Sequence, residues 1–292
     1  MKHKKKNRTL FICIYVFLSL IALFSLVMIG KELYESYKSK SEFDDLSNIF
    51  WGEDVPSTES DNLESTDNNE PINPDQNINL DATPDLLPEE DDDNSGQAPT
   101  VNKPVEPALK RDLNKLMQIN PDCVGWIYTS GTKLNYPVMY TPNSPQKYLR
   151  RSFYGNKTVE GVPYIDEYCT LTGGHVIIYG HNMNNGTMFG SIKKYKKQNY
   201  FKQHPTIELE TKATGVKNYK VFAVCLVKDD DLIYSVNNFE NEENFNEFVQ
   251  TYKQMSYYDT GVNPVYGKQI ITLSTCDSSA DTNRIVVLAT EI

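Results

Sequence analysis

Hydrophobic and polar residues divide this chain into three parts of different character. Residues 9–30 form an uncharged, almost wholly apolar run of 22 residues, and a strongly polar stretch follows as far as residue 108. From residue 109 to the C-terminus, short apolar runs alternate with turn-forming segments. This pattern predicts a membrane-spanning segment, a linker and a folded domain, in that order.

Residues 109–292 have the pattern of a domain built mostly from short strands. Their apolar runs are rich in β-branched and aromatic residues and are bounded by Gly, Pro and Asn. We expect strands at 124–128, 134–140, 161–165, 175–180, 206–211, 217–227, 268–275 and 284–291. Many strands with few helices favour a mostly β fold, a closed or nearly closed β-barrel with peripheral helices.

Three helical segments are predicted around these strands. The first begins near Pro107, which suits a first helical turn, and its apolar face consists of Leu109, Leu113, Leu116 and Met117. The other two cover residues 188–197 and 240–256. The apolar face of the last helix consists of Phe245, Phe248, Val249 and Tyr252.

The apolar run at residues 9–30 is long enough to cross a membrane. At about 1.5 Å per residue, such a helix spans a hydrocarbon core about 30 Å thick. Residues 1–8 form a basic leader, which favours a cytoplasmic N-terminus and an extracytoplasmic domain. A cleaved signal peptide is the alternative, but the run is long for one and no small-x-small cleavage site follows it. We therefore expect a single-pass membrane anchor that is not removed.

Residues 31–108 are predicted to form an acidic, disordered linker. Residues 41–108 contain 19 Asp or Glu and one Lys, a net charge of −18. A segment with so few large apolar side chains cannot bury enough surface to offset its chain entropy. The linker would tether the domain at a distance from the membrane. An acidic docking segment for a basic partner is the alternative.

Charge, cysteine and histidine usage exclude several classes of function. Residues 109–292 carry 20 Lys or Arg and 18 Asp or Glu, so no basic surface for nucleic acid is expected. The five cysteines include no CxxC pair and the four histidines are scattered, which argues against a metal site. No cofactor is predicted. Cys123, Cys169 and Cys225 lie in or beside predicted strands and are interpreted as buried small side chains.

The most informative segment is the apolar run that ends at Cys276. A short polar turn follows it, and Arg284 begins the next apolar run. If the two runs pair as strands, the thiol and the guanidinium lie together at one end of the sheet. A nearby positive charge favours the thiolate form that a nucleophilic cysteine needs. His181 follows a third apolar run and supplies an acid or base, so the three residues together predict acyl transfer.

Residues 272–276 read TLSTC and match the TLxTC motif of sortases, the cysteine transpeptidases of Gram-positive cell surfaces. Other segments resemble the class B members of that family, in the same order along the chain. They are Gly125–Ile127, Tyr136–Val138, Tyr148–Leu149, Ser152–Phe153, Tyr179–His181, Thr187–Phe189, Tyr200–His204 and Ile207–Leu209. The resemblance covers most of residues 109–292 and implies the eight-stranded sortase barrel for this region.

The resemblance also implies a course of reaction. Cys276 would attack the threonine carbonyl of a C-terminal sorting motif in an exported protein, His181 would protonate the departing amine, and Arg284 would stabilise the oxyanion or hold the substrate. An amine from a peptidoglycan cross-bridge or a pilin lysine would then resolve the acyl-enzyme. The resemblance implies no cofactor, and it places the enzyme in the membrane of a Gram-positive cell.

Substrate-binding residues follow from the same resemblance. Leu149, Ser274 and Thr275 match positions near the peptide groove, although Thr275 also fits a strand residue packed beneath the site. Residues 229–267 are expected to form one wall of the groove. Asp277 is adjacent to the nucleophile and is interpreted as a turn residue.

Two other classes of function remain open at this stage. A papain-like hydrolase of the cell wall would place its cysteine early, at a helix N-terminus, and its histidine later in the chain. Here the order is reversed. A membrane-anchored surface scaffold without catalysis would have no need of Cys276, so blocking the thiol separates that class from a transpeptidase.

Overall fold

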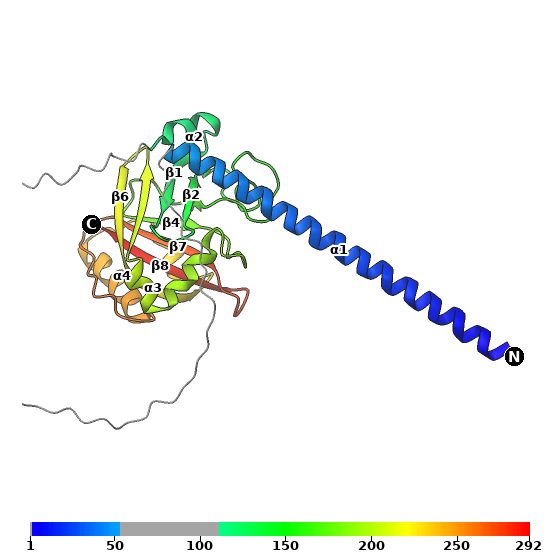
Figure 1. Cartoon of the computed structure of the whole chain (residues 1–292). Coiled ribbons are helices and arrows are strands. Elements are labelled where there is room, and N and C mark those ends of the chain that lie inside the picture. The colour runs from blue at the N-terminus through cyan, green and yellow to red at the C-terminus, as the bar shows by residue number, and fades with distance from the viewer. Residues whose placement is uncertain (1, 53–110) are drawn as a thin grey trace, which may run out of the picture. The chain divides into compact units, whose positions relative to one another are not determined.

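The computed structural model describes residues 2–52 and 111–292, and the side chains of residues 14–52 and 111–292 (Figure 1). Residues 111–292 contain eight strands that close into a barrel in the order β1-β2-β3-β4-β7-β8-β6-β5. The strands are β1 (Cys123–Tyr128), β2 (Asn135–Met139), β3 (Tyr164–Ile165), β4 (His175–Tyr179), β5 (Thr206–Thr211), β6 (Gly215–Lys228), β7 (Ile270–Cys276) and β8 (Asn283–Glu291). The predicted closed β-barrel is confirmed.

Each predicted strand has a counterpart in the structure. In β5, burial alternates as the sequence pattern predicts, since Ile207 and Leu209 are buried while Glu208 and Glu210 are half-exposed. The strand expected at 161–165 is shorter than predicted. Gly161 has a positive φ of 61° and Pro163 has no N–H to donate, so regular pairing begins only at Tyr164.

Two parallel pairings, β2 with β3 and β4 with β7, interrupt an otherwise antiparallel barrel. Because β4 and β7 run in the same direction, their C-terminal ends meet at one edge of the barrel. The register places Tyr179 opposite Ser274. Since β8 runs antiparallel to β7, its first residues reach the same edge. Three segments distant in sequence therefore converge there.

Short helices surround the barrel. They are α2 (Leu113–Ile119), the 3₁₀ helix η1 (Phe189–Lys196), α3 (Gln198–Gln203), the 3₁₀ helix η2 (Leu232–Ser235) and α4 (Glu242–Met255). The apolar face predicted for α4 is buried, and its Tyr252 carbonyl accepts from the Cys225 thiol of β6 at 3.2 Å. The predicted opening helix begins only at Leu113, and Pro107 and Leu109 lie outside the described residues. α3 and η2 were not predicted.

The N-terminal helix corrects the predicted boundary of the linker. α1 runs from Lys2 to Trp51, so residues 31–51 are helical and do not belong to a disordered linker. Phe43, Leu46, Phe50 and Trp51 are buried in the same hydrophobic cluster as barrel residues. Their spacing puts them on one helical face, and burial of that face stabilises the extension. Residues 53–108 of the predicted linker lie outside the described residues.

Polar contacts add to the apolar contacts between α1 and the barrel. The Asn135 side chain accepts from the indole N–H of Trp51 at 3.0 Å and from that of Trp126 at 2.7 Å, and it donates to Ser47 Oγ at 3.0 Å. The Phe50 and Trp126 rings stack at 4.5 Å. This end of α1 is therefore part of the folded domain.

The first part of α1 has a different character. Its exposed apolar side chains give a segment with a mean hydropathy of 2.2, near the N-terminus, with none of that window buried. By length and composition this is the one described helix that could cross a membrane, and a signal sequence meets the same test.

Candidate active site

Cys276 and Arg284 are direct cross-strand neighbours. The apolar, β-branched segment before Cys276 forms β7, whose first six residues are buried and whose last residue, Cys276, is exposed. Cys276 is paired with Arg284 in the antiparallel register of β7 and β8. In such a pair the two Cβ atoms lie about 5 Å apart on the same face of the sheet. The predicted pairing of the two strands is therefore confirmed, and it sets Cys276 opposite Arg284.

His181 reaches the same edge from β4. The Gly180 N–H donates to the Ser274 carbonyl at 3.2 Å, and the Asn182 side chain donates to the Cys276 carbonyl at 3.0 Å. These two bonds hold the residues on either side of His181 against the end of β7. Gly180 has no room for a side chain, because a Cβ there would lie 2.6 Å from the Phe189 ring.

A backbone carbonyl orients the imidazole of His181. His181 Nε2 donates to the Leu149 carbonyl at 2.8 Å, which leaves Nδ1 as the basic nitrogen of the neutral ring. Burial lowers the pKa of His181, and the positive charge of Arg150 lowers it further. The hydrogen bond to the Leu149 carbonyl acts in the opposite direction and raises it. Gly161 packs against the Leu149 carbonyl so closely that a Cβ would lie 2.5 Å from its oxygen.

One pocket of about 390 Å³ is lined by His181, Cys276 and Arg284 together. Leu149, Ser274 and Thr275 also line it, so the structure brings all six predicted site residues into one place. The Ser274 hydroxyl hydrogen-bonds with the Tyr234 hydroxyl at 2.8 Å. The Thr275 hydroxyl donates to the Gly180 carbonyl at 2.7 Å and ties β7 to the end of β4.

Arg284 is held by the turn between β7 and β8. Its Nη1 donates to the carbonyls of Asp281 at 2.6 Å and Asn283 at 3.0 Å, and its Nη2 pairs with Asp229 at 3.4 Å. Arg284 and Asp229 both line the pocket. The guanidinium is therefore a partly exposed cation at the pocket wall, and its planar set of donors can turn toward an oxygen bound there.

Asp277 is a turn residue, as predicted, and it also has a salt bridge. Its side chain is 8% exposed and accepts from Lys196 Nζ of η1 at 2.5 Å. Burial alone would raise the pKa of Asp277, but hydrogen bonds from Lys196 and Ser279 and the charge of Lys196 lower it to about 2. This ion pair fixes the residue that directly follows Cys276.

Two site features were missed by reasoning from sequence. Tyr234 and Asp229 line the pocket from the 229–267 connection, which was predicted as a wall without naming these residues. Lys196 is 81 positions from Asp277 in the sequence, so no local sequence pattern predicts their contact. Among the described residues, no group of three or more His, Cys, Asp or Glu side chains is placed to hold a metal ion. Cys123, Cys169 and Cys225 are buried and free, as predicted.

Residues 130–292 match the family model of the sortase domain. The chain belongs to the sortase family. It is similar to sortase B of Listeria monocytogenes, with 33% identity over 63% of this chain and 74% of the relative. Sortase B of Staphylococcus aureus is 34% identical over 62% of this chain and 75% of the relative.

Solved structures agree with that assignment. A substrate complex of Staphylococcus aureus sortase B has a TM-score of 0.57 and 34% identity, covering 62% of this chain and 84% of that one. The structure of Clostridium perfringens sortase B has a TM-score of 0.57 and 30% identity, covering 61% of this chain and 98% of that one. This sortase is a cysteine transpeptidase of the class B type. The papain-like alternative also fails on geometry, because Cys276 ends a strand.

Proposed function

We propose that this sortase cleaves a C-terminal sorting motif in exported proteins and transfers the acyl group to an amine. The candidate acceptors are a peptidoglycan cross-bridge and a pilin lysine. The observation that carries the proposal is the pairing of Cys276 with Arg284 in one pocket with His181. The three residues would act as nucleophile, charge stabiliser and proton carrier.

In the acylation step, the Cys276 sulfur forms a bond to the scissile carbonyl carbon while its proton passes to His181 Nδ1. The carbonyl oxygen becomes an oxyanion, and Arg284 stabilises it through its planar donors. The C–N bond then breaks, and the imidazolium returns its proton to the departing amine. A thioester on Cys276 remains, and no energy source is needed because the thioester retains the acyl group's reactivity.

In the deacylation step, the acceptor amine attacks the thioester carbon and loses a proton to His181. The C–S bond breaks and releases the Cys276 sulfur, which regains the proton. The bond from His181 Nε2 to the Leu149 carbonyl supports this assignment, because it holds the ring in one tautomer with Nδ1 as the base.

Substrate selection is assigned to the remaining pocket walls. Leu149 and Tyr234 lie on segments far apart in sequence and line the same pocket, which suits a peptide held between two walls. Ser274 holds Tyr234 in place through their hydroxyl contact. We assign Thr275 a supporting role beneath the site, since its hydroxyl is bonded to Gly180.

The apolar part of α1 supports a proposal for the location of this enzyme. We propose that the apolar part of this helix spans the cell membrane of a Gram-positive bacterium, with the basic leader inside. Protease added to intact, wall-stripped cells should then remove the barrel and leave a small membrane stub. Full protection of the barrel would invert the orientation, and a mature chain that starts after Gly30 would show that the anchor is cleaved.

The Cys276→Ala substitution tests the chemistry. It should abolish acyl-enzyme formation and peptide transfer, measured by mass spectrometry with a fluorescent sorting peptide and an added amine, while circular dichroism stays unchanged. Cys225→Ala is the matched control, because that thiol is buried against α4 away from the pocket. Turnover at the wild-type rate by the Cys276 variant would refute the proposed mechanism.

A further inference from the structure

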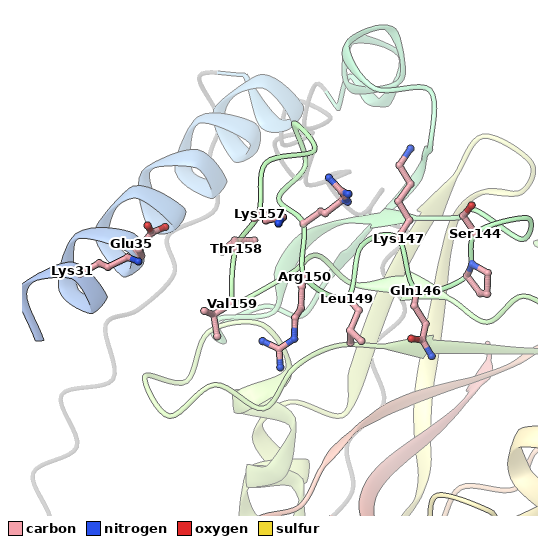
Figure 2. A pocket seen from close by; sticks show the side chains of 12 residues that line it. Lys31, Glu35, Ser144, Gln146, Lys147, Leu149, Arg150, Lys157, Thr158 and Val159 are labelled. Atoms are coloured by element: carbon pink, nitrogen blue, oxygen red, sulfur yellow. The ribbon is translucent and has the colours of Figure 1, made fainter. Parts of the chain in front are cut away.

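A second cavity lies beside the catalytic pocket, between α1 and the segment 144–159. Its volume is about 1010 Å³, and Figure 2 shows Lys31 and Glu35 on α1 across from Lys157, Thr158 and Val159. Its lining includes five cations and one acid: Lys31, Lys147, Arg150, Arg151, Lys157 and Glu35. We call it the basic cleft. It shares Pro145, Gln146 and Leu149 with the catalytic pocket, so the two cavities adjoin.

Four of the five cations have no acidic partner within the described part of the chain. Lys147 pairs with Asp122 at 2.5 Å, and Arg151 donates to the Gly155 carbonyl at 3.0 Å. Lys31, Arg150 and Lys157 are exposed and form no ion pair among the described residues. Their positive charges are therefore available to an anionic ligand, and Arg150 adds a planar fork that suits a phosphate.

The basic cleft opens where α1 leaves its apolar part. Lys31 is the first residue after the run 9–30, and Glu35 follows one helical turn later. On this stretch Tyr34 and Tyr37 are 65% and 74% exposed, and Val159 on the opposite wall is 62% exposed. Tyrosines of this kind are enriched at the level of lipid headgroups, where an apolar ring and a polar hydroxyl are both accommodated.

Contacts with α1 hold the segment 144–159 at that level. The Phe153 N–H of this segment donates to Glu42 of α1 at 3.0 Å. Outside the segment, the Asn185 side chain also donates to Ser36 of α1 at 3.2 Å. From Gly30 to the first buried residue of α1, Ser39, the helix rises only about 14 Å at 1.5 Å per residue. If α1 spans the bilayer, the basic cleft therefore lies at the membrane surface.

We propose that the basic cleft binds the phosphate headgroups of anionic phospholipids in the outer leaflet. This inference rests on the membrane-spanning role proposed for α1. Headgroup binding would neutralise Lys31, Arg150 and Lys157 together and hold the segment 144–159 against the bilayer. Leu149 lies on that segment and its carbonyl orients His181, so the lipid contact borders the catalytic machinery.

Hydrogen–deuterium exchange of the full chain in nanodiscs tests this proposal. We expect amides in the segment 144–159 to exchange severalfold more slowly when phosphatidylglycerol is added to phosphatidylcholine, and high salt should reduce the difference. Lys31→Glu combined with Lys157→Glu should abolish it. The matched control combines Lys212→Glu with Lys220→Glu, which makes the same change of charge at exposed lysines that line neither cavity.

The outcomes separate this inference from the proposed function. Equal exchange in the two kinds of nanodisc would overturn the lipid site. Equal protection in lipid-free detergent would also overturn it, since another part of the chain would then occupy the basic cleft. Peptide transfer by the same samples reports the chemistry independently. Failure of the chain to remain in nanodiscs would refute the membrane span itself.

Discussion

At the scale of single residues, Arg284 has contacts with the turn and a position opposite Cys276. Its bonds to Asp281 and Asn283 are to backbone carbonyls, and its ion pair with Asp229 is partly exposed. Exposed ion pairs contribute at most about 1 kcal/mol to folding. A larger effect of substitution on catalysis than on folding would therefore point to a role in the reaction.

Arg284→Lys should lower kcat/KM by two to three orders of magnitude, about 2.7–4 kcal/mol, the usual cost of losing an oxyanion donor. Lysine keeps the charge but loses the planar fork of donors. Steady-state kinetics with a sorting peptide and urea unfolding of the same samples measure both effects. Near-normal turnover would mean that charge alone suffices, and parallel losses of activity and stability would support a structural role.

His175 is a fully buried histidine away from the pocket. Its Nδ1 donates to the Val236 carbonyl at 2.5 Å and its Nε2 accepts from the Thr272 hydroxyl at 2.7 Å. Burial lowers the pKa of His175 to about 4 from 6.5, only partly offset by the Val236 bond. Between about pH 4 and pH 6.5, His175 is therefore protonated in the unfolded chain but neutral in the folded state.

The free energy of unfolding should consequently fall as the pH decreases from about 6.5 to about 4, by roughly 3 kcal/mol from this one group. Below pH 4 the contribution should level off. Urea unfolding at a series of pH values measures the change, and His175→Gln should remove that part of the slope even if the variant is less stable overall. The same slope in both proteins would contradict the assignment.

At the scale of elements, strands were predictable and the end of α1 was not. In β5 and β7 the apolar pattern is local, and Cys276, Arg284 and His181 each stand next to an apolar run. Residues 43, 46, 50 and 51 do follow helical spacing, but the acidic residues between them concealed it. Tyr234 and Ser274 are far apart in the sequence, and only the folded barrel brings them together, so no local pattern predicts their contact.

The docking of α1 can be measured through Trp51. Trp51→Ala should lower the free energy of unfolding by about 3–5 kcal/mol, because it removes a buried indole, its bond to Asn135 and its contact with Arg111. Tyr37→Ala is the control on the same helix, since that ring is 74% exposed. Urea unfolding of the full chain in detergent provides the comparison. Equal stability of the two variants would show that α1 contributes nothing to the fold.

At the scale of the whole molecule, the described residues on either side of positions 53–110 are in contact with each other. The Asp112 N–H donates to the Phe50 carbonyl at 2.8 Å, and Arg111 lies over the Trp51 ring at 4.8 Å. Residues 31–51 of the predicted linker belong to α1, which packs on the barrel. The tether role of residues 53–108, which lie outside the described residues, stays a prediction.

Replacing residues 56–107 with a short Gly-Ser connection should leave peptide transfer within about twofold of the full chain and stability within about 0.5 kcal/mol, because the contacts at both ends remain. Steady-state kinetics and urea unfolding measure the two quantities. A loss of transfer without a loss of stability would assign the acidic segment a direct part in the reaction.

The continuity of α1 has a further consequence for how this enzyme meets its substrates. If α1 spans the membrane as proposed, an unbroken helix from Lys2 to Trp51 that also packs on the barrel confines the pocket to a thin layer above the bilayer. Within that layer, encounters occur by lateral diffusion in two dimensions. The rate of transpeptidation would then follow the number of substrate molecules per area of membrane, and bulk concentration would have little influence on it.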